Sequence, residues 1–215
     1  MSSARPHLRS WPAALLLAFL LASAPWASPA TFPLRVSDDH RYLVDRDGRP
    51  FLVVGDTAWS LIAQLGAEDC ARYLGDRARR GFNAIIVNLL EHKFASRAPA
   101  LRDGTPPFAA AVDFTHPNPA CFAFAHRAVE QAQRRGISVW LCPAYLGWGG
   151  GDEGFFKEIQ AAGPVALRGY GRFLGEHFRD LPNIVWCRTT STHWSPPAKG
   201  PSPPSSRRRA RRTAD

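Results

Sequence analysis

The chain has 215 residues, and 45% of them are hydrophobic, a proportion typical of a globular protein and not of a disordered one. The formal net charge is +9, but the segment from Cys187 onward holds seven basic residues and one acidic residue and so supplies +6 of it. The rest of the chain is only mildly basic. We therefore expect one ordinary domain and no nucleic-acid partner for its folded part.

The first thirty residues have the pattern of a secretory signal. Three basic residues come first: Arg5, His7 and Arg9. An apolar run from Trp11 to Ala24 follows, and small residues, Ser28 and Ala30, stand at positions −3 and −1 before Thr31. The run is shorter than the roughly 20 residues of a membrane span, so an anchor is the less favoured alternative. We expect a cleaved signal peptide over residues 1–30, a secreted or periplasmic protein, and no stable membrane span after cleavage.

The next elements predict the start of an α/β domain. Residues 41–57 indicate a short hairpin with a turn at Asp47–Gly48, followed by an apolar strand from Phe51 to Val54. Residues 67–81 have helical spacing of apolar residues and end at Gly81. The run "FNAIIVNLL" is typical of a strand buried on both faces, and a long loop follows over about residues 91–119.

The same order then repeats. Residues 121–136 predict a helix, "ISVWLCP" a second buried strand, and "YLGWGGGDEG" a glycine-rich loop. A helix or helix pair is expected over about residues 155–178, interrupted near Gly163–Pro164, and "NIVW" begins the next strand. This alternation favours a parallel sheet with right-handed crossovers. Both an open doubly wound sheet and a (β/α)8 barrel fit.

The sequence gives no sign of a cofactor or metal. Neither a G-x-G-x-x-G nor a P-loop lies at a strand-to-helix turn, which weakens the nucleotide-binding architecture. The four cysteines show no paired spacing and no CxxC, so we expect mostly buried free thiols, with a single disulfide left open.

Polar and aromatic residues follow the predicted strands, where parallel α/β folds gather their functional groups. The candidates are Asp56, Trp59, Asn88, Glu91, His92, Tyr145 and Trp148. Aromatic faces stack on the C–H surfaces of a sugar, and carboxylates and amides bond its hydroxyls, so this mixture suits a carbohydrate. Five of these candidates have a structural alternative: a turn cap for Asp56, a core position for Trp59, a satisfied amide for Asn88, and a solvated loop pair for Glu91 and His92.

Four ordered stretches carry a family resemblance: "GRPFLVVGDTAWSL", "YLGDRARRGFNAIIVNLL", "PFAAAVDFTHPNPACFAFAHRAVEQAQRRGISVWLCPAYLG" and "YGRFLGEHFRDLPNIVW". From about Leu43 to Trp186 the chain resembles the apiosidase-like glycoside hydrolases. The resemblance implies a (β/α)8 barrel and retaining hydrolysis of glycosidic bonds in plant or microbial polysaccharide. Retaining hydrolysis needs two carboxyl groups about 5 to 5.5 Å apart.

Neither catalytic carboxylate of that family transfers to this sequence. The family's acid/base aspartate belongs to a Gly-Gly-Asp motif directly after the "NIVW" strand, and its nucleophile is a glutamate much later in the barrel. Here "NIVW" is followed by "CRTT". Asp56, Asn88 and Tyr145 transfer as substrate-pocket residues only, and the catalytic residues stay unknown.

The fold class we predict is α/β, the amino-terminal half of a (β/α)8 TIM-type barrel truncated after the fourth strand, because such a barrel takes about 250 residues. Residues 31–186 would form this incomplete domain. Residues 187–215, rich in Ser, Pro and Arg, have no apolar period and are expected to be disordered. We interpret them as a frameshift product, with a genuine basic tail as the alternative.

The leading functional hypothesis is a secreted, apiosidase-like glycoside hydrolase fragment that is inactive on its own. Two alternatives remain: a carbohydrate-binding module without chemistry, and an anionic-surface binder that uses "SSRRRARR".

Overall fold

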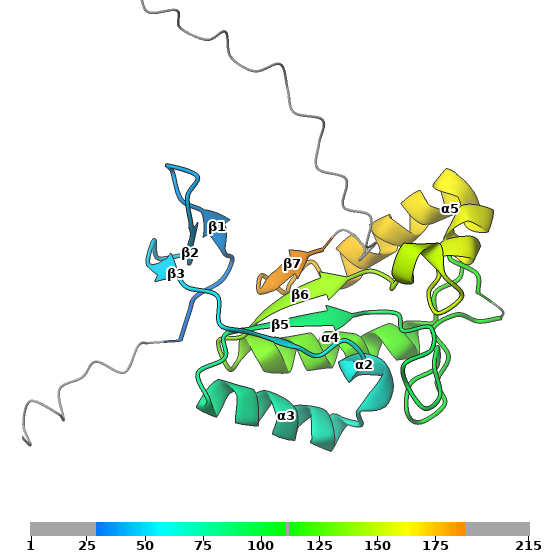
Figure 1. Ribbon diagram of the computed structural model, residues 1–215, viewed down its shortest axis with the longest axis horizontal. Coiled ribbons are helices and arrows are strands. Elements are labelled where there is room, and N and C mark those ends of the chain that lie inside the picture. Colours follow the sequence, from blue (N-terminus) through cyan, green and yellow to red (C-terminus); the bar gives the residue numbers. More distant parts are fainter. Residues whose placement is uncertain (1–28, 111, 188–215) are drawn as a thin grey trace, which may run out of the picture.

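The computed structural model describes residues 29–110 and 112–187 (Figure 1). The apolar core of the expected signal and the tail from residue 188 lie outside these residues, so those predictions remain as stated. Within the described part, no helix is long and apolar enough to cross a bilayer.

A small antiparallel sheet comes first. Its strands are β1 (Arg35–Val36), β2 (Leu43–Val44) and β3 (Pro50–Phe51), in the order β1-β2-β3. The turn between β2 and β3 passes through Gly48 at φ +82°, a conformation that favours glycine. The hairpin predicted around Asp47–Gly48 is therefore confirmed.

The predicted strand from Phe51 to Val54 is wrong. Phe51 ends β3, where it pairs with Leu43, and the next three residues belong to no strand; Leu52 is 80% exposed. The first strand of the main sheet is instead β4 (Gly55–Thr57). The apolar run crosses from one sheet to the other, and a run of apolar residues does not show which partner each of them takes.

The main sheet is parallel. Strands β4, β5 (Ala84–Asn88), β6 (Ser138–Cys142) and β7 (Ile184–Trp186) follow one another in chain order. In both β5 and β6 four of the five residues are buried and only the middle one is half-buried, as expected for strands with apolar side chains on both faces. The predicted parallel α/β fold is confirmed over these four strands.

Helices connect the strands. They are α2 (Leu61–Gln64), α3 (Ala67–Arg79), α4 (Pro119–Gln133) and α5 (Phe156–His177), with a 3-10 turn, η1 (Trp148–Gly150), before α5. Asn118 caps α4 by accepting the Ala120 amide at 3.1 Å, with Pro119 at the first position. Gly163, at φ +72°, and Pro164 break α5 where the sequence predicts an interruption.

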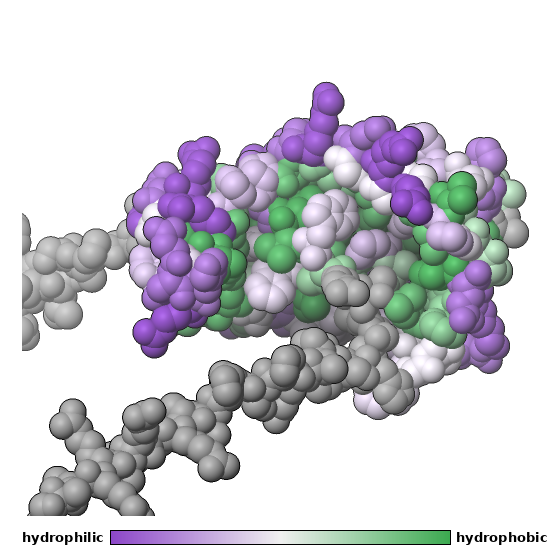
Figure 2. Space-filling model, turned by 90° about the horizontal axis from the view of Figure 1, so that it is seen from above, coloured by the Kyte–Doolittle hydropathy of each residue, from purple (hydrophilic) through white to green (hydrophobic). Residues whose placement is uncertain are grey.

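One face of the sheet is covered. Helices α3 and α4 lie under it in Figure 1, and the packing is built from fully buried side chains such as Leu74 of α3 and Phe122 of α4 against Ile85 and Val139 of the strands. Alternate strand residues point to the opposite face. There the paired residues Ile86 and Trp140 are only half-buried. Figure 2 shows that hydrophobic side chains lie open in the middle of this side of the molecule.

All four cysteines are free thiols, and Cys70, Cys121 and Cys142 are buried. Cys187 follows β7 next to Cys142 and donates its backbone N–H to Leu141 at 3.0 Å. A hydrogen bond with the Cys142 thiol lowers the pKa of Cys187 to about 7 against the opposing effect of burial.

Candidate functional site

A buried carboxylate lies at the carboxyl end of β5. Glu91 is 1% exposed and three residues beyond the end of the strand. Its Oε2 accepts hydrogen bonds from Ser60 Oγ at 3.0 Å and from Asn88 Nδ2 at 3.2 Å, and its Oε1 accepts the His92 backbone N–H at 3.0 Å. We call Ser60, Asn88, Glu91 and His92 the Glu91 cluster.

The three groups that donate hydrogen bonds to Glu91 are all uncharged. Within residues 29–110 and 112–187, Glu91 forms no ion pair with an arginine, lysine or histidine side chain. Asn88 is 3% exposed, and its Oδ1 has no hydrogen-bond partner among the described residues. Buried polar atoms are normally partnered, so a buried carboxyl group without a basic partner beside an unused acceptor is an unusual arrangement.

His92 links this strand end to α5. Its Nε2 lies 3.2 Å from Glu158 Oε1, and its ring packs edge-on against Phe155 with centroids 4.7 Å apart. Glu158 is in the first turn of α5, where the partial positive charge of the helix end favours an acidic side chain.

Aromatic side chains lie next to the Glu91 cluster. Tyr145 meets Phe94 edge-on with centroids 5.9 Å apart. Burial, followed by the charges of Glu153 and Glu91, raises the pKa of Tyr145. Phe94 is 59% exposed and Trp148 is 73% exposed. We call Phe94, Tyr145 and Trp148 the aromatic rim.

A glycine-rich loop presents Trp148. The Trp148 backbone N–H donates to Glu153 Oε1. A Cβ on Gly147 would come within 2.6 Å of the Gly151 carbonyl oxygen, and one on Gly154 would overlap the backbone of Gly147. Only glycine fits this close approach, which explains the glycines at positions 147 and 154 of the loop.

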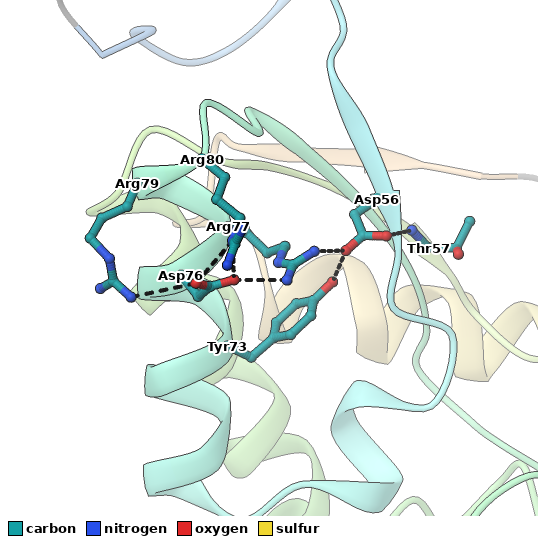
Figure 3. Close-up of polar contacts among 7 residues, drawn as sticks. All are labelled: Asp56, Thr57, Tyr73, Asp76, Arg77, Arg79 and Arg80. Atoms are coloured by element: carbon teal, nitrogen blue, oxygen red, sulfur yellow. Dashed lines mark hydrogen bonds and ion pairs between the residues drawn. The ribbon is translucent and has the colours of Figure 1, made fainter.

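Asp56 belongs to a different arrangement (Figure 3). Its Oδ2 accepts the Tyr73 hydroxyl at 2.9 Å and Arg77 Nη1 at 2.9 Å, and its Oδ1 accepts the Thr57 N–H at 2.8 Å. Arg77 also reaches Asp76 at 2.7 Å. Burial acts to raise the pKa of Asp56, but the Tyr73, Thr57 and Arg77 donors outweigh it and lower the pKa.

Asp56 therefore ties β4 to α3. It pairs in register with Ile85, whose side chain belongs to the helix-covered core, and this places Asp56 on the helix side of the sheet. No described hydrogen bond joins it to the Glu91 cluster. Of the seven candidates, Asp56 is the one whose carboxylate is bonded to side chains of α3.

Trp59 has an intermediate position. Its side chain is 37% exposed and lines a cavity of about 250 Å³ on the α2 side, together with Tyr73 and Gln64. Its backbone carbonyl accepts the Asn88 N–H at 2.9 Å. The structure thus connects Trp59 to the end of β5 through the main chain.

The structure brings Asn88, Glu91, His92 and Tyr145 together at one end of the sheet, and Trp148 is exposed on the glycine-rich loop that follows Tyr145. Sequence reasoning missed Ser60, Glu158 and Phe94. Ser60 directly follows the candidate Trp59, and Phe94 stands two residues after the candidate His92. The expectation that functional groups follow the strand ends could therefore have included both. Glu158 had no such signal, because it lies 66 residues from its partner His92.

Metal binding has no support in the described residues, where no group of three or more His, Cys, Asp or Glu side chains is arranged to hold an ion.

Solved structures show the class of fold. A glycoside hydrolase family 5 structure from Bacteroides vulgatus is 23% identical, with a TM-score of 0.56 over 71% of this chain and 31% of that one. A structure titled "Glycoside hydrolase" is 24% identical, with a TM-score of 0.55 over 71% of this chain and 33% of that one. The described residues have the TIM-barrel-like α/β fold of these proteins, and the chain spans about a third of their length.

A match to a protein family assigns the chain more specifically than its fold does. The profile "Apiosidase-like, catalytic domain" matches residues 37–210, so the chain belongs to the apiosidase-like family. This match confirms the resemblance seen in the sequence and extends past Trp186, where that resemblance ends. No curated protein is similar enough to the chain to be counted as a relative.

Proposed function

We propose that this chain is part of a secreted apiosidase-like glycoside hydrolase that acts on plant or microbial polysaccharide, and that it supplies one section of the carbohydrate-binding surface. In the complete domain the reaction would be retaining hydrolysis by two carboxylates. The chain by itself would bind carbohydrate without turnover.

The observation that carries this proposal is the meeting of the aromatic rim with the Glu91 cluster at the carboxyl end of the parallel sheet. Functional groups of TIM-type folds gather at this end. Exposed Trp148 and Phe94 offer flat apolar faces, whereas Asn88 Oδ1, an unused acceptor, is itself buried. A few placed polar groups beside aromatic faces are typical of a small-molecule site.

Three observations support the proposal that this chain forms only part of the barrel domain. Within the described residues, β4 and β7 each have one neighbouring strand, and the side chains of Ile86 and Trp140 stay partly open on the face without helices. The matched structures are about three times as long. The sequence after β7 lacks the family's Gly-Gly-Asp motif.

We assign no catalytic role to the carboxylates of the site. Glu91 is occupied by three donors, and Glu158 is paired with His92. Their geometry suits orientation: Glu91 holds Ser60 and Asn88 in place, and Glu158 holds the His92 ring.

The binding claim is tested by titrating the purified chain with pectic oligosaccharides in a calorimeter. Trp148→Ala is expected to weaken binding by roughly threefold to tenfold, because it removes a stacking face. Tyr42→Ala is the matched control, since Tyr42 is 50% exposed but precedes β2 in the small sheet. Equal binding by both variants and the unchanged chain would contradict the proposal.

The incompleteness claim is tested by measuring release of reducing ends from the same oligosaccharides. We expect no turnover by the purified chain. Hydrolysis above that of an enzyme-free blank would show that the chain holds its own catalytic pair.

We also propose that residues 187–215 arose by a frameshift. Sequencing the gene across the codons for Pro182–Asp215 and translating all three frames is expected to reveal a Gly-Gly-Asp motif after "NIVW" in another frame. A confirmed reading frame with no such continuation would leave the basic tail as a genuine feature.

A further inference from the structure

A second buried carboxylate lies far from the aromatic rim, in the small antiparallel sheet. Asp45 directly follows β2 and is 3% exposed. Its Oδ1 accepts the backbone N–H groups of Asp47 at 3.0 Å and Arg49 at 2.9 Å. Its Oδ2 accepts Arg49 Nε at 2.9 Å and lies 2.8 Å from Arg49 Nη2.

One further donor reaches Asp45 from outside the hairpin. The backbone nitrogen of Thr31 lies 3.4 Å from Asp45 Oδ2, and the Thr31 carbonyl accepts the Arg46 N–H at 3.0 Å. Thr31 Oγ1 is buried and has no hydrogen-bond partner among the described residues, and the next side chain, Phe32, is 6% exposed. Thr31 is thus held against the hairpin through its own main chain.

The residues before Thr31 make a different contact. Pro29 packs on the turn after α4, where a Cβ on Gly136 would come within 2.9 Å of the Pro29 Cβ. Pro29 and Ala30 line a cavity of about 550 Å³ that also includes Asp45 and Arg49. The Ala30–Thr31 peptide bond therefore joins a segment in contact with the turn after α4 to one that is bonded to the hairpin.

We propose that an export protease cleaves the Ala30–Thr31 bond and that the new α-ammonium group of Thr31 forms an ion pair with Asp45, which fastens the mature amino terminus to the small sheet. In this hydrolysis, water adds a hydroxyl to the Ala30 carbonyl carbon and a proton to the Thr31 nitrogen. The freed amine then takes a further proton from solvent.

The charges favour this arrangement. An α-amino group has an ordinary pKa of about 7.7 to 8.0, so it is mainly protonated at neutral pH. Burial acts to raise the pKa of Asp45, but the donors from Arg49 and Thr31 outweigh it and hold the pKa at about 2, so the carboxylate is charged. Hydrogen bonds between two charged groups are shorter and stronger than those between neutral ones. Cleavage thus exchanges one neutral amide donor for a cation with three donors.

The proposal rests on export, which is part of the proposed function, and not on carbohydrate binding. The first experiment exports the full chain from a bacterial host and determines the amino-terminal residue of the purified product by intact mass and sequencing. We expect Thr31. An intact leader or another first residue would overturn the proposal, whatever the result of the carbohydrate titration.

The second experiment uses periodate, which oxidises an amino-terminal threonine through its adjacent amine and hydroxyl groups. We expect Thr31 of the native product to react at least about tenfold more slowly than in the Asp45→Asn variant, because the ion pair holds it in place. Asp47→Asn is the matched control: Asp47 pairs with Arg49 at 3.1 Å but is half-exposed and does not contact Thr31. Equal rates in all three proteins would contradict the ion pair.

A third measurement covers the case in which Asp45→Asn fails to fold, since Asp45 also holds Arg49. Chains that begin at Thr31 and at Ala30 differ by one residue, and only the first places an ammonium at Asp45. We expect the Thr31 chain to unfold at higher urea concentration, and equal midpoints would refute the proposal.

Discussion

Asp56 lies within β4 and Glu91 follows the neighbouring strand β5, and these two carboxylates have different partners. Asp56 is about a quarter exposed and is bonded to Arg77 and Tyr73 of α3. Glu91 is fully buried and is bonded to Ser60, Asn88 and the His92 backbone, all uncharged. A carboxylate neutralised by an adjacent helix is typical of a structural link, whereas a buried one without a counterion is typical of a functional site.

The largest effect on stability is expected at Glu91. Glu91→Ala leaves the Ser60 hydroxyl, the Asn88 amide and the His92 N–H without their acceptor in a buried place, so we expect a loss of about 3 kcal/mol in the free energy of unfolding. Urea titration measures this loss. Glu68→Ala is the control, because the Glu68 side chain is 91% exposed and is expected to change stability by less than about 0.5 kcal/mol. If Glu91→Ala lowered the free energy of unfolding as little as Glu68→Ala, the hydrogen bonds of Glu91 would not stabilise the fold.

A smaller effect is expected at Asp56. Asp56→Asn weakens a partly exposed ion pair, so we expect a loss of about 1 kcal/mol at neutral pH. The folded-state pKa of Asp56 is lowered from its ordinary value of 3.8, so the stabilisation is present above that pH and is lost as the pH falls through the folded-state pKa.

Urea titrations of the unchanged chain and of Asp56→Asn, run from pH 7 down to below pH 3.8, measure this dependence. The two proteins are expected to converge in stability at the acid end. A difference that stays constant over the whole range would show that the charge of Asp56 contributes nothing.

The smallest effect is expected at Tyr73. Tyr73→Phe removes one hydrogen bond to Asp56 and keeps the ring, so we expect a loss of about 0.5 to 1 kcal/mol, measured in the same titration. Tyr42→Phe, on an exposed ring, is the control and is expected to leave stability unchanged. If both variants behave alike, the Tyr73 hydroxyl does not hold Asp56.

The cysteines allow a further comparison at the other edge of the sheet. Cys187 is expected to react with iodoacetamide along a pH profile centred near 7, because the thiolate is the nucleophile and its pKa is lowered to about 7. Cys142→Ala removes the hydrogen-bond partner, so the profile is expected to move towards the ordinary value of 9.0. An unchanged profile in that variant would contradict the contact between the two thiols.

The sequence alone determined the order of elements and the type of sheet. Continuous apolar runs predict β5 and β6, helical spacing that ends at Gly81 predicts α3, and Gly163–Pro164 predicts the break in α5. These features depend on residues near one another in the chain. The sequence also indicated the end of the sheet at which Asn88, Glu91 and His92 gather, because the ends of parallel strands meet at one edge.

Tertiary structure alone decided which way each polar group points and what it meets. Neighbouring residues of a strand face opposite sides, and the apolar run from Phe51 to Val54 did not show that the chain changes sheets, so the side taken by Asp56 could not be read from sequence. Glu91 meets Ser60 across 31 residues, and His92 meets Glu158 across 66. Such contacts are set by how β4, β5 and α5 pack, and no local pattern records them.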